Sequence, residues 1–224
     1  MMKAIAHIKS PFTTKFGVPR QSGLVDELCC EIHFEPEFRN PDALRGIDKF
    51  DYIWLIWDFS LNREREGWHP TVRPPRLGGN TGVGVFASRS PYRPNPLGLS
   101  SVRLLSVDFE KCILKVSGAD LADGTPIYDI KPYIAYADAH PEASGGFVDE
   151  VDFPQLKVVM PGNAAEILGK KNALALEKAL LLDPRPQYQN DPEKIYGMSF
   201  AGCEVRFTVR EQVLTVLEIV RGNI

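Results

Sequence analysis

Six arginines lie within one short segment of the chain, between positions 63 and 93. They are Arg63, Arg65, Arg73, Arg76, Arg89 and Arg93. Two glutamates, Glu64 and Glu66, leave the segment with a local charge of +4, whereas the whole chain has a formal net charge of −3. Because arginine forms strong bonds to phosphate and carboxylate groups, the segment predicts binding of phosphates or of an acidic ligand. The alternative reading is a solvated basic face.

Prolines hold part of this segment in a fixed conformation. The stretch GVFASRSPYRPNPLGLS (84–100) contains Pro91, Pro94 and Pro96 within six positions, with Arg89 and Arg93 among them. Proline fixes the backbone angle φ, and a loop that is already rigid loses less entropy when a ligand binds. The stretch therefore predicts a preorganised site. Loops stiffened for stability alone are the alternative.

A second group of chemically capable residues lies in DLADGTPIYDIKPY (120–133). Asp120, Asp123 and Asp129 could bind ribose hydroxyls or a cationic ligand, or accept a proton. Asp-Gly at 123–124 is equally typical of a plain hairpin turn. A third stretch, FGVPRQSGL (16–24), carries Arg20 and Gln21 on a Gly/Pro loop and is a weak signal by itself.

Several common chemistries have no motif here. The chain has no Walker loop, no Ser/His/Asp order and no activated-cysteine motif, and its four histidines lack metal-ligand spacing, so we expect no metal. GVGVFA (82–87) satisfies the dinucleotide pattern G-x-G-x-x-A. It follows a turn and precedes prolines that cannot begin a helix, so we reject a Rossmann reading.

Composition bounds the class of protein. The 224 residues are 44% hydrophobic and 25% charged, which is typical of a globular chain with a full core. We expect neither a signal peptide nor a membrane helix, because no apolar run is long enough. The four cysteines show no disulfide framework, which predicts a reducing, intracellular compartment.

The elements that must position these residues are mostly strands. Apolar, β-branched and aromatic runs predict strands at 3–9, 25–34, 52–59, 83–88, 99–109 and 112–118. We also expect a short helix at 41–49 with Asn40 as its cap. A second helix is expected at 164–182, with Asn163 as its N-cap and Glu166 completing an N-x-x-E capping box. A hairpin should turn at 210–212. The prediction is a mainly β fold: a β-barrel domain at 1–142 and a small α+β domain at 143–224.

Five motifs in register resemble one known family. VPRQSGL, PTVRPPRLGGN, GVFASRSPYRPNPLGLS, DLADGTPIYDIKPYI and LDPRPQY occur in this order and are similar to the TsaA/TrmO-like tRNA methyltransferases. That family methylates threonylcarbamoyladenosine just 3′ of the anticodon. The resemblance implies a β-barrel, S-adenosylmethionine as cofactor, tRNA bound through its anticodon loop, a homodimer and a cytoplasmic location, with no membrane partner.

The resemblance also assigns cofactor contacts residue by residue. These map to Pro19, Arg20, Gln21, Ser60, Leu61, Arg89, Leu99, Asp120, Leu121, Ala122, Asp123, Gly124 and Thr125. Family members commonly carry a histidine where WLIWDFSLN (54–62) has Ser60, and serine lacks a ring and a titration near neutral pH.

RNA contacts and the proton acceptor complete the expectations. Arg73, Arg76, Tyr92, Arg93 and Arg185 are the expected RNA-binding residues, with Tyr92 stacking on a base. Arg185 suits a plain interdomain turn equally well. Asp129 or solvent would accept the proton of the methylated nitrogen. The alternatives are a tRNA- or nucleotide-binding barrel without catalysis, and a methyltransferase with another acceptor.

Overall fold

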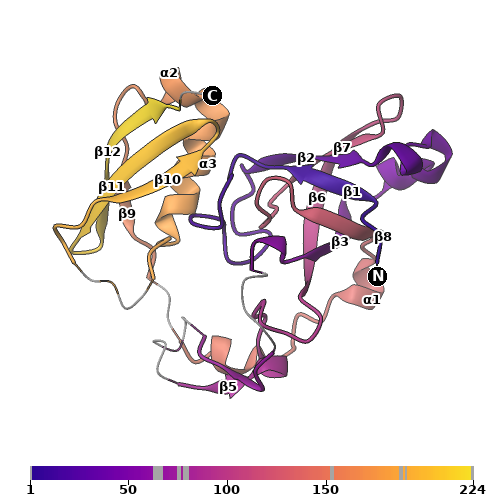
Figure 1. Ribbon diagram of the computed structural model, residues 1–224, viewed down its shortest axis with the longest axis horizontal. Helices are drawn as coiled ribbons and strands as arrows, with labels where there is room; N and C mark the ends of the chain where they lie inside the picture. Colours follow the sequence, from indigo (N-terminus) through magenta and orange to yellow (C-terminus); the bar gives the residue numbers. More distant parts are fainter. Residues whose placement is uncertain are drawn as a thin grey trace.

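The computed structural model describes residues 2–62, 68–74, 77, 81–151, 154–186, 189 and 191–222. In this part of the chain, a closed barrel built from the N-terminal half lies beside a smaller unit of sheet and helices (Figure 1). The prediction of a mainly β fold with an N-terminal barrel and a small α+β unit is confirmed. Within the described residues no helix is both long and apolar enough to cross a membrane.

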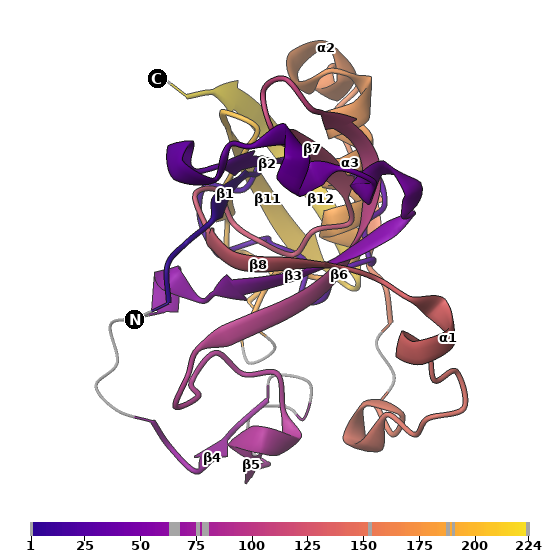
Figure 2. The ribbon, with the colours of Figure 1, turned by 90° about the vertical axis from the view of Figure 1, so that its right-hand side faces the viewer.

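Six antiparallel strands close the barrel. Around it they run in the order β1 (Ala6–Lys9), β2 (Cys29–Phe34), β7 (Ile113–Ser117), β6 (Leu97–Asp108), β3 (Tyr52–Asp58) and β8 (Pro126–Pro132). Figure 2 shows β3, β6 and β8 side by side in its wall. Closure leaves no unpaired sheet edge. The strand β8 was not predicted, because its residues were interpreted as an irregular loop.

Alternating side chains decide which residues face the barrel core. In β3, Ile53 and Leu55 are fully buried, and they pair with Val102 and Ser100 of β6. Their neighbours Tyr52, Trp54 and Ile56 point outward and are partly or largely exposed. The near-continuous apolar run of β3 is typical of a strand covered on both faces, but in this structure only one face meets the core.

Two predicted elements of the N-terminal half are shorter than expected. The helix at 41–49 is a pair of 3-10 turns, Pro41–Leu44 and Ile47–Lys49, separated by Gly46 in a left-handed conformation (φ 85°). Asn40 does cap the first of them, since its side chain accepts a hydrogen bond from the amide of Asp42. The strand at 83–88 ends after Val83–Gly84 (β5) and continues as a 3-10 turn.

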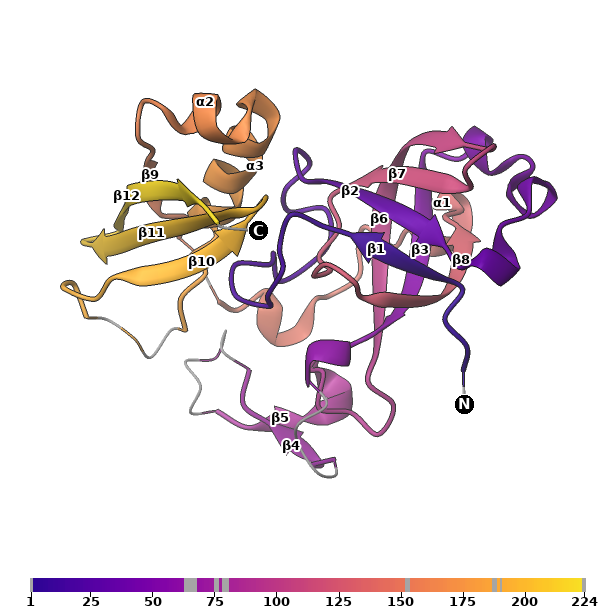
Figure 3. The same cartoon turned by 45° about the horizontal axis from the view of Figure 1, so that its top comes forward.

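The short strand β5 belongs to a projection from the barrel. Within the part of the chain that the structure describes, it pairs only with β4 (Thr71–Val72), and Figures 2 and 3 show the two strands away from both larger sheets. The projection carries most of the described part of the arginine-rich segment.

The C-terminal unit combines a four-stranded sheet with helices. The sheet order is β10 (Tyr196–Phe200), β11 (Cys203–Arg210), β12 (Val213–Arg221) and β9 (Lys157–Val159). The predicted hairpin is β11–β12, whose turn holds Glu211 and Gln212 at positive φ. The helix expected at 164–182 is two helices, α2 (Ala164–Leu168) and α3 (Lys170–Leu181), because Gly169 adopts φ 79° between them. Asn163 makes no side-chain cap, so that prediction was wrong. A short helix, α1 (Ala135–Asp138), follows β8.

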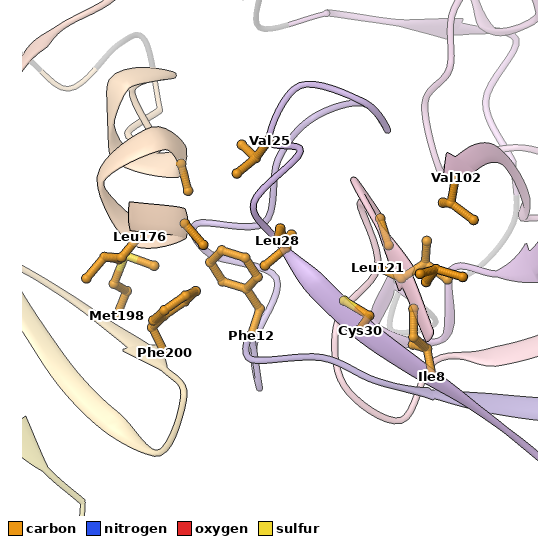
Figure 4. Packing of buried hydrophobic residues seen from close by; sticks show 14 of the residues in the cluster. Ile8, Phe12, Val25, Leu28, Cys30, Val102, Leu121, Leu176, Met198 and Phe200 are labelled. Carbon is orange, nitrogen blue, oxygen red and sulfur yellow. The ribbon is translucent and has the colours of Figure 1, made fainter. Parts of the chain in front are cut away.

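A shared apolar core joins the two units. Phe12, in the loop after β1, packs edge-on against Phe200 of β10 with ring centroids 5.0 Å apart. Figure 4 shows Phe12 between Leu28 and the side chains of Leu176 and Phe200. The amide of Ala201 also donates to the carbonyl of Pro11 at 2.8 Å. Because Phe12 and Phe200 are both fully buried, the junction is as dry as either core.

Candidate cofactor pocket and basic face

Three segments meet on one side of the barrel and bring together residues from three of the sequence motifs. They are the loop 18–23, the proline loop 85–96 and the turn 117–122. Arg89 of the proline loop donates a hydrogen bond from Nη1 to Oε1 of Gln21. The amide of Gly23 donates to the carbonyl of Gly118 at 2.8 Å, which fixes the first segment against the third. The arrangement places the Arg89 guanidinium and the backbone amide of Ser22 near the carboxylate of Asp120.

Asp120 is held from the barrel interior by a chain of hydrogen bonds. Trp57 donates from Nε1 to the Ser100 hydroxyl at 2.9 Å, and that hydroxyl donates to Oδ1 of Asp120 at 2.5 Å. Trp57 reaches this position because it lies over Gly98. A Cβ at position 98 would stand 2.1 Å from Cε2 of the indole ring. Sequence reasoning missed Trp57 and Ser100. The polar Ser100 at an inward-facing position of an apolar strand was the available signal.

The electrostatics of Asp120 set it apart from the other carboxylates of its motif. Burial raises the pKa of Asp120 above its ordinary value, and burial outweighs the hydrogen bond from Ser100 and the nearby charge of Arg89. A hydrogen bond from the backbone amide of Ser22 acts in the same lowering direction. A partly desolvated carboxylate is stabilised by a cationic or hydroxyl-bearing ligand that replaces lost water. Asp120 is therefore the residue of the motif best placed to bind such a group.

The proline loop is rigid because its own hydrogen bonds add to its prolines. Arg93 donates from Nη1 to the carbonyls of Val85 at 3.1 Å and Ser88 at 2.6 Å. Ser88 and Ser90 accept hydrogen bonds from amides two residues further on. Arg93 thus holds the loop from inside, whereas Arg89 is exposed. Tyr92 is half-buried in the same loop.

Ser60 and Leu61 flank the proline loop at the end of β3. They form a 3-10 turn, Ser60–Asn62, and the preceding residue, Phe59, donates its amide to the carbonyl of Pro96 at 3.0 Å. This contact brings the predicted cofactor residues 60 and 61 next to the loop that carries Arg89.

Two other predicted residues lie on the outer face of the barrel. Leu99 and Asp129 both pair with Ile56, whose side chain points outward, and Leu99 is 58% exposed. Asp129 forms an ion pair with Lys131 at 2.9 Å. The barrel wall separates these two side chains from the inward-facing Ser100 that supports Asp120.

The rest of the 120–125 stretch shapes the turn into β8. Leu121, Ala122 and Thr125 are buried, and Gly124 takes φ 72° while donating its amide to the carbonyl of Ile8. Asp123 accepts a hydrogen bond from the amide of Ser10 at 2.9 Å. Its carboxylate borders a separate hollow between the barrel and α3. That hollow is also lined by Lys9, Cys30, Lys115 and Lys171.

The hollow beside Asp123 holds a thiol without nucleophilic character. Burial raises the pKa of Cys30 to about 12, so its thiol stays protonated at neutral pH. A thiolate reaction at this position has no support.

Arg20 and Arg185 meet where the barrel contacts the C-terminal unit. Arg20 donates from Nη2 to the carbonyls of Asp183 and Arg185, both at 3.3 Å, and it follows the buried Pro19. Arg185 binds Asp183 through two bonds, Nε to Oδ1 at 2.9 Å and Nη2 to Oδ2 at 2.8 Å. The Arg185 side chain is only 11% exposed. Of the other predicted RNA contacts, Arg73 is exposed. Arg63, Arg65 and Arg76 lie outside the described residues.

Among the described residues, no three His, Cys, Asp or Glu side chains cluster in a way that could hold a metal ion. Arg89, Gln21 and Asp120 are polar side chains that the three segments bring near one another. This set offers an anion-binding group, an amide and a carboxylate. It complements a ligand that carries both a carboxylate and a cation or hydroxyls.

Comparison with known proteins gives agreement over nearly the whole chain. Residues 7–139 match the family profile described as the tRNA-methyltransferase O N-terminal domain, and residues 154–222 match the TrmO C-terminal domain. The chain is 40% identical over 222 residues to the tRNA (adenine(37)-N6)-methyltransferase of Escherichia coli (strain K12), covering 92% of each chain.

Pseudomonas aeruginosa provides two further relatives. One has the provisional name S-adenosylmethionine-dependent methyltransferase RcsF; it is 37% identical over 98% of this chain and 97% of its own length. The other is a crystal structure of TrmO from Pseudomonas aeruginosa. It superposes with a TM-score of 0.80 at 29% identity, and the match covers 98% of this chain and 97% of that one.

Proposed function

Because the chain belongs to the TrmO family, we propose that it is a tRNA methyltransferase acting on N6 of the adenosine at position 37. More specifically, we propose that the methyl donor is S-adenosylmethionine and that the acceptor is the threonylcarbamoyl form of that adenosine. The name of the Pseudomonas aeruginosa relative supports the donor. The acceptor rests on the motif resemblance.

The observation that carries the proposal is that Arg89 lies close enough to Asp120 for its charge to act on that carboxylate. S-adenosylmethionine has a carboxylate, an ammonium group and ribose hydroxyls, and when bound it supplies a methyl group on a positively charged sulfur. An exposed guanidinium suits the carboxylate, and a partly buried carboxylate suits the ammonium group or the hydroxyls. The donor set of the pocket therefore fits the cofactor on chemical grounds.

Each residue of the pocket has a separate task in this proposal. Arg89 binds the cofactor carboxylate, and Gln21 orients the Arg89 guanidinium through their hydrogen bond. Asp120 binds the cationic or hydroxyl-bearing part, and Ser100 and Trp57 hold its carboxylate in position. Methyl transfer is an in-line displacement, so most of the rate enhancement comes from this alignment of donor and acceptor. Asp123 faces a different hollow and is the weaker candidate for the same cofactor.

The acceptor nitrogen must lose a proton during transfer. The role of Asp129 as proton acceptor stays a prediction. Its carboxylate pairs with Lys131 and lies on the outer face of the barrel, so we favour solvent. Neither assignment changes the tasks of Arg89 and Asp120.

The tRNA approaches, in this proposal, along the arginine-bearing projection. Arg73 is exposed there, and no acidic residue occurs between positions 68 and 107 of the sequence. Exposed positive charge attracts the phosphate backbone without selecting a sequence. Selection of the modified adenosine then falls to the pocket.

The homodimer and the compartment are also parts of the proposal. The exposed Leu99 on the outer barrel face is the kind of apolar side chain that a partner subunit covers. The four cysteines are all free thiols, which suits the reducing cytoplasm in which tRNA is modified. Sedimentation of the purified protein tests directly whether it is a homodimer.

Labelled methyl transfer tests the central proposal. Purified protein is incubated with methyl-labelled S-adenosylmethionine and two tRNA pools that differ only in threonylcarbamoylation. We expect label in the modified pool alone. Label in both pools would indicate another acceptor, and tight tRNA binding without label in either would indicate a binding protein.

A further inference from the structure

Two aromatic side chains are stacked on each other at the surface of the projection. The rings of Trp68 and Phe86 have centroids 6.2 Å apart and planes inclined by 28°. Phe86 is 71% exposed and Trp68 is 48% exposed. Keeping two large apolar rings in water forgoes the stabilisation that their burial would give, so the pair calls for an explanation other than packing.

The backbone around the pair is fixed by several contacts. The strands β4 and β5, which lie between the two aromatic residues in the sequence, pair at Thr71–Gly84 and Val72–Val83. The amide of Val85 donates to the carbonyl of Pro70 at 2.9 Å, and the Val85 side chain is buried. Trp68 and Phe86 therefore stand on opposite arms of one small, tied scaffold.

Arg93 supports Phe86 with its guanidinium 5.7 Å from the ring centroid. The same guanidinium is bound to the carbonyls of Val85 and Ser88, so its position does not depend on a ligand. The cation, Phe86 and Trp68 form a rigid aromatic platform that loses little entropy when another flat group stacks on it.

The net charge of the segment that carries this platform favours one kind of flat group. Between positions 63 and 93 the sequence contains six arginines and two glutamates, and Arg73 and Arg89 are exposed. A ligand that combines a flat aromatic ring with negative charge is a nucleotide. A second copy of this chain fits poorly, because a symmetric contact between two such patches would place arginines against arginines.

We propose that Trp68 and Phe86 form a stacking platform for an unpaired base of the RNA loop that enters the pocket. This inference rests on the proposed function, since it presumes an RNA substrate. It assigns to the projection a contact with a base, in addition to contacts with phosphates. It also gives Arg93 a positioning role beneath the platform.

Alanine substitution at Phe86 tests the platform. Binding of an anticodon stem-loop RNA is measured by fluorescence anisotropy at several salt concentrations for wild type and Phe86→Ala. Because stacking on an aromatic side chain contributes about 1–3 kcal/mol per base, we expect affinity to fall roughly 5- to 150-fold. The dependence on salt should not change, because no phosphate contact is lost. Phe86→Tyr keeps a ring and should retain affinity near that of wild type.

Phe109→Ala is the matched control, because Phe109 is also exposed but lies in the distant turn between β6 and β7. It should leave RNA affinity unchanged. Thermal unfolding of each variant excludes a folding defect, and Trp68→Leu provides a second, independent loss of the platform.

Abasic RNA identifies the base. An abasic residue is placed at each loop position in turn, and its effect is compared between wild type and Phe86→Ala. At the stacked position the two losses should not add, whereas at other positions they should. Equal RNA affinity of wild type, Phe86→Ala and Trp68→Leu would overturn the proposal. A substitution of Phe86 or Trp68 that dissociates a dimer but keeps RNA affinity would also overturn the proposal, because the two rings would then form a subunit contact.

Two further measurements on wild type, its affinity for S-adenosylmethionine and its methyl transfer to tRNA, distinguish failure of the platform from failure of the proposed function. If wild type methylates tRNA and Phe86→Ala binds RNA equally well, the platform fails while the enzyme stands. If wild type binds RNA through Phe86 but transfers no methyl group, the platform stands and the proposed enzymatic function fails.

Discussion

Two proline-flanked arginine loops look alike in sequence and differ in structure. SRSPYRPNP (88–96) and DPRPQ (183–187) each place an arginine between prolines, and both resembled RNA-binding loops. In the first loop Arg89 is exposed, and Arg93 supports an exposed ring. In the second, Arg185 is paired with Asp183, nearly buried, and close to Arg20.

The difference comes from the neighbouring acid. Asp183 stands two residues from Arg185 and neutralises it, whereas the sequence around Arg89 and Arg93 has no carboxylate for many residues. An acid whose pKa the charge of Arg89 affects is Asp120, which comes from another strand connection. An arginine between prolines therefore indicates a rigid loop, and the local acids indicate whether its charge remains available.

Substitution of Gly98 should have the largest effect of these changes. It acts on Asp120, the acid that the charge of Arg89 in the first loop affects. In Gly98→Ala the new Cβ would overlap the Trp57 ring, displacing the indole that holds Ser100 and Asp120. We expect a loss of about 3 kcal/mol in the free energy of unfolding, at the upper end for overpacked cores, together with weaker cofactor binding. Chemical denaturation measures the first and calorimetry the second. Gly84→Ala, where a Cβ meets open space, should leave both unchanged.

Removal of the first loop's exposed charge should affect binding without affecting stability. Arg89→Ala should lower S-adenosylmethionine affinity roughly 10- to 100-fold, because a hydrogen bond to a charged group contributes about 1.5–3 kcal/mol. Its unfolding free energy should stay within about 0.5 kcal/mol of wild type. The matched control is Arg103→Ala, another exposed arginine on the following strand. Equal cofactor affinity of all three proteins would contradict the assignment of Arg89.

Removal of Arg185, the arginine of the second loop, should lower stability without lowering cofactor affinity. Arg185→Ala leaves Asp183 without its two bonds in a largely buried place, so we expect a loss of about 1–3 kcal/mol in unfolding free energy. Cofactor affinity of the folded protein should be unchanged. Arg206→Ala breaks an exposed ion pair with Glu218 and should cost less than about 1 kcal/mol. A loss of tRNA affinity without a loss of stability would show that the two loops are alike after all.

The smallest expected effect is on pH dependence. Because the pKa of folded Asp120 is raised, the folded state binds this proton more tightly than the unfolded state. Stability from this group should therefore fall as pH rises from the ordinary carboxylate pKa of 3.8 through the raised value. Asp120→Asn should remove that fall. Denaturant unfolding between pH 4 and 8 measures it, and parallel curves for both proteins would contradict the raised pKa.

Local patterns predicted five of the six barrel strands and the charged loops, because these depend on residues near in sequence. The alternation in β2 and β11 and the hairpin at 210–212 are of this kind. Gly46 and Gly169 broke the two predicted helices, since a single positive φ overrides a helical pattern.

The pocket depended on distant pairings that no spacing reveals. Asp120 and Asp123 are three residues apart, yet one meets Ser100 and the other Ser10. Which aspartate faces Arg89 follows from how β6, β7 and β8 close the barrel. The resemblance named both residues together, and only the barrel's register distinguishes them.

The position of Phe12 has a consequence for how the chain is made. Phe12 belongs to the loop after β1, and its partner Phe200 belongs to β10, far along the chain. A chain whose barrel strands have paired before β10 has docked therefore leaves the Phe12 ring without this contact. Such an intermediate exposes an apolar ring and is prone to aggregation, and docking of the C-terminal unit ends this exposure.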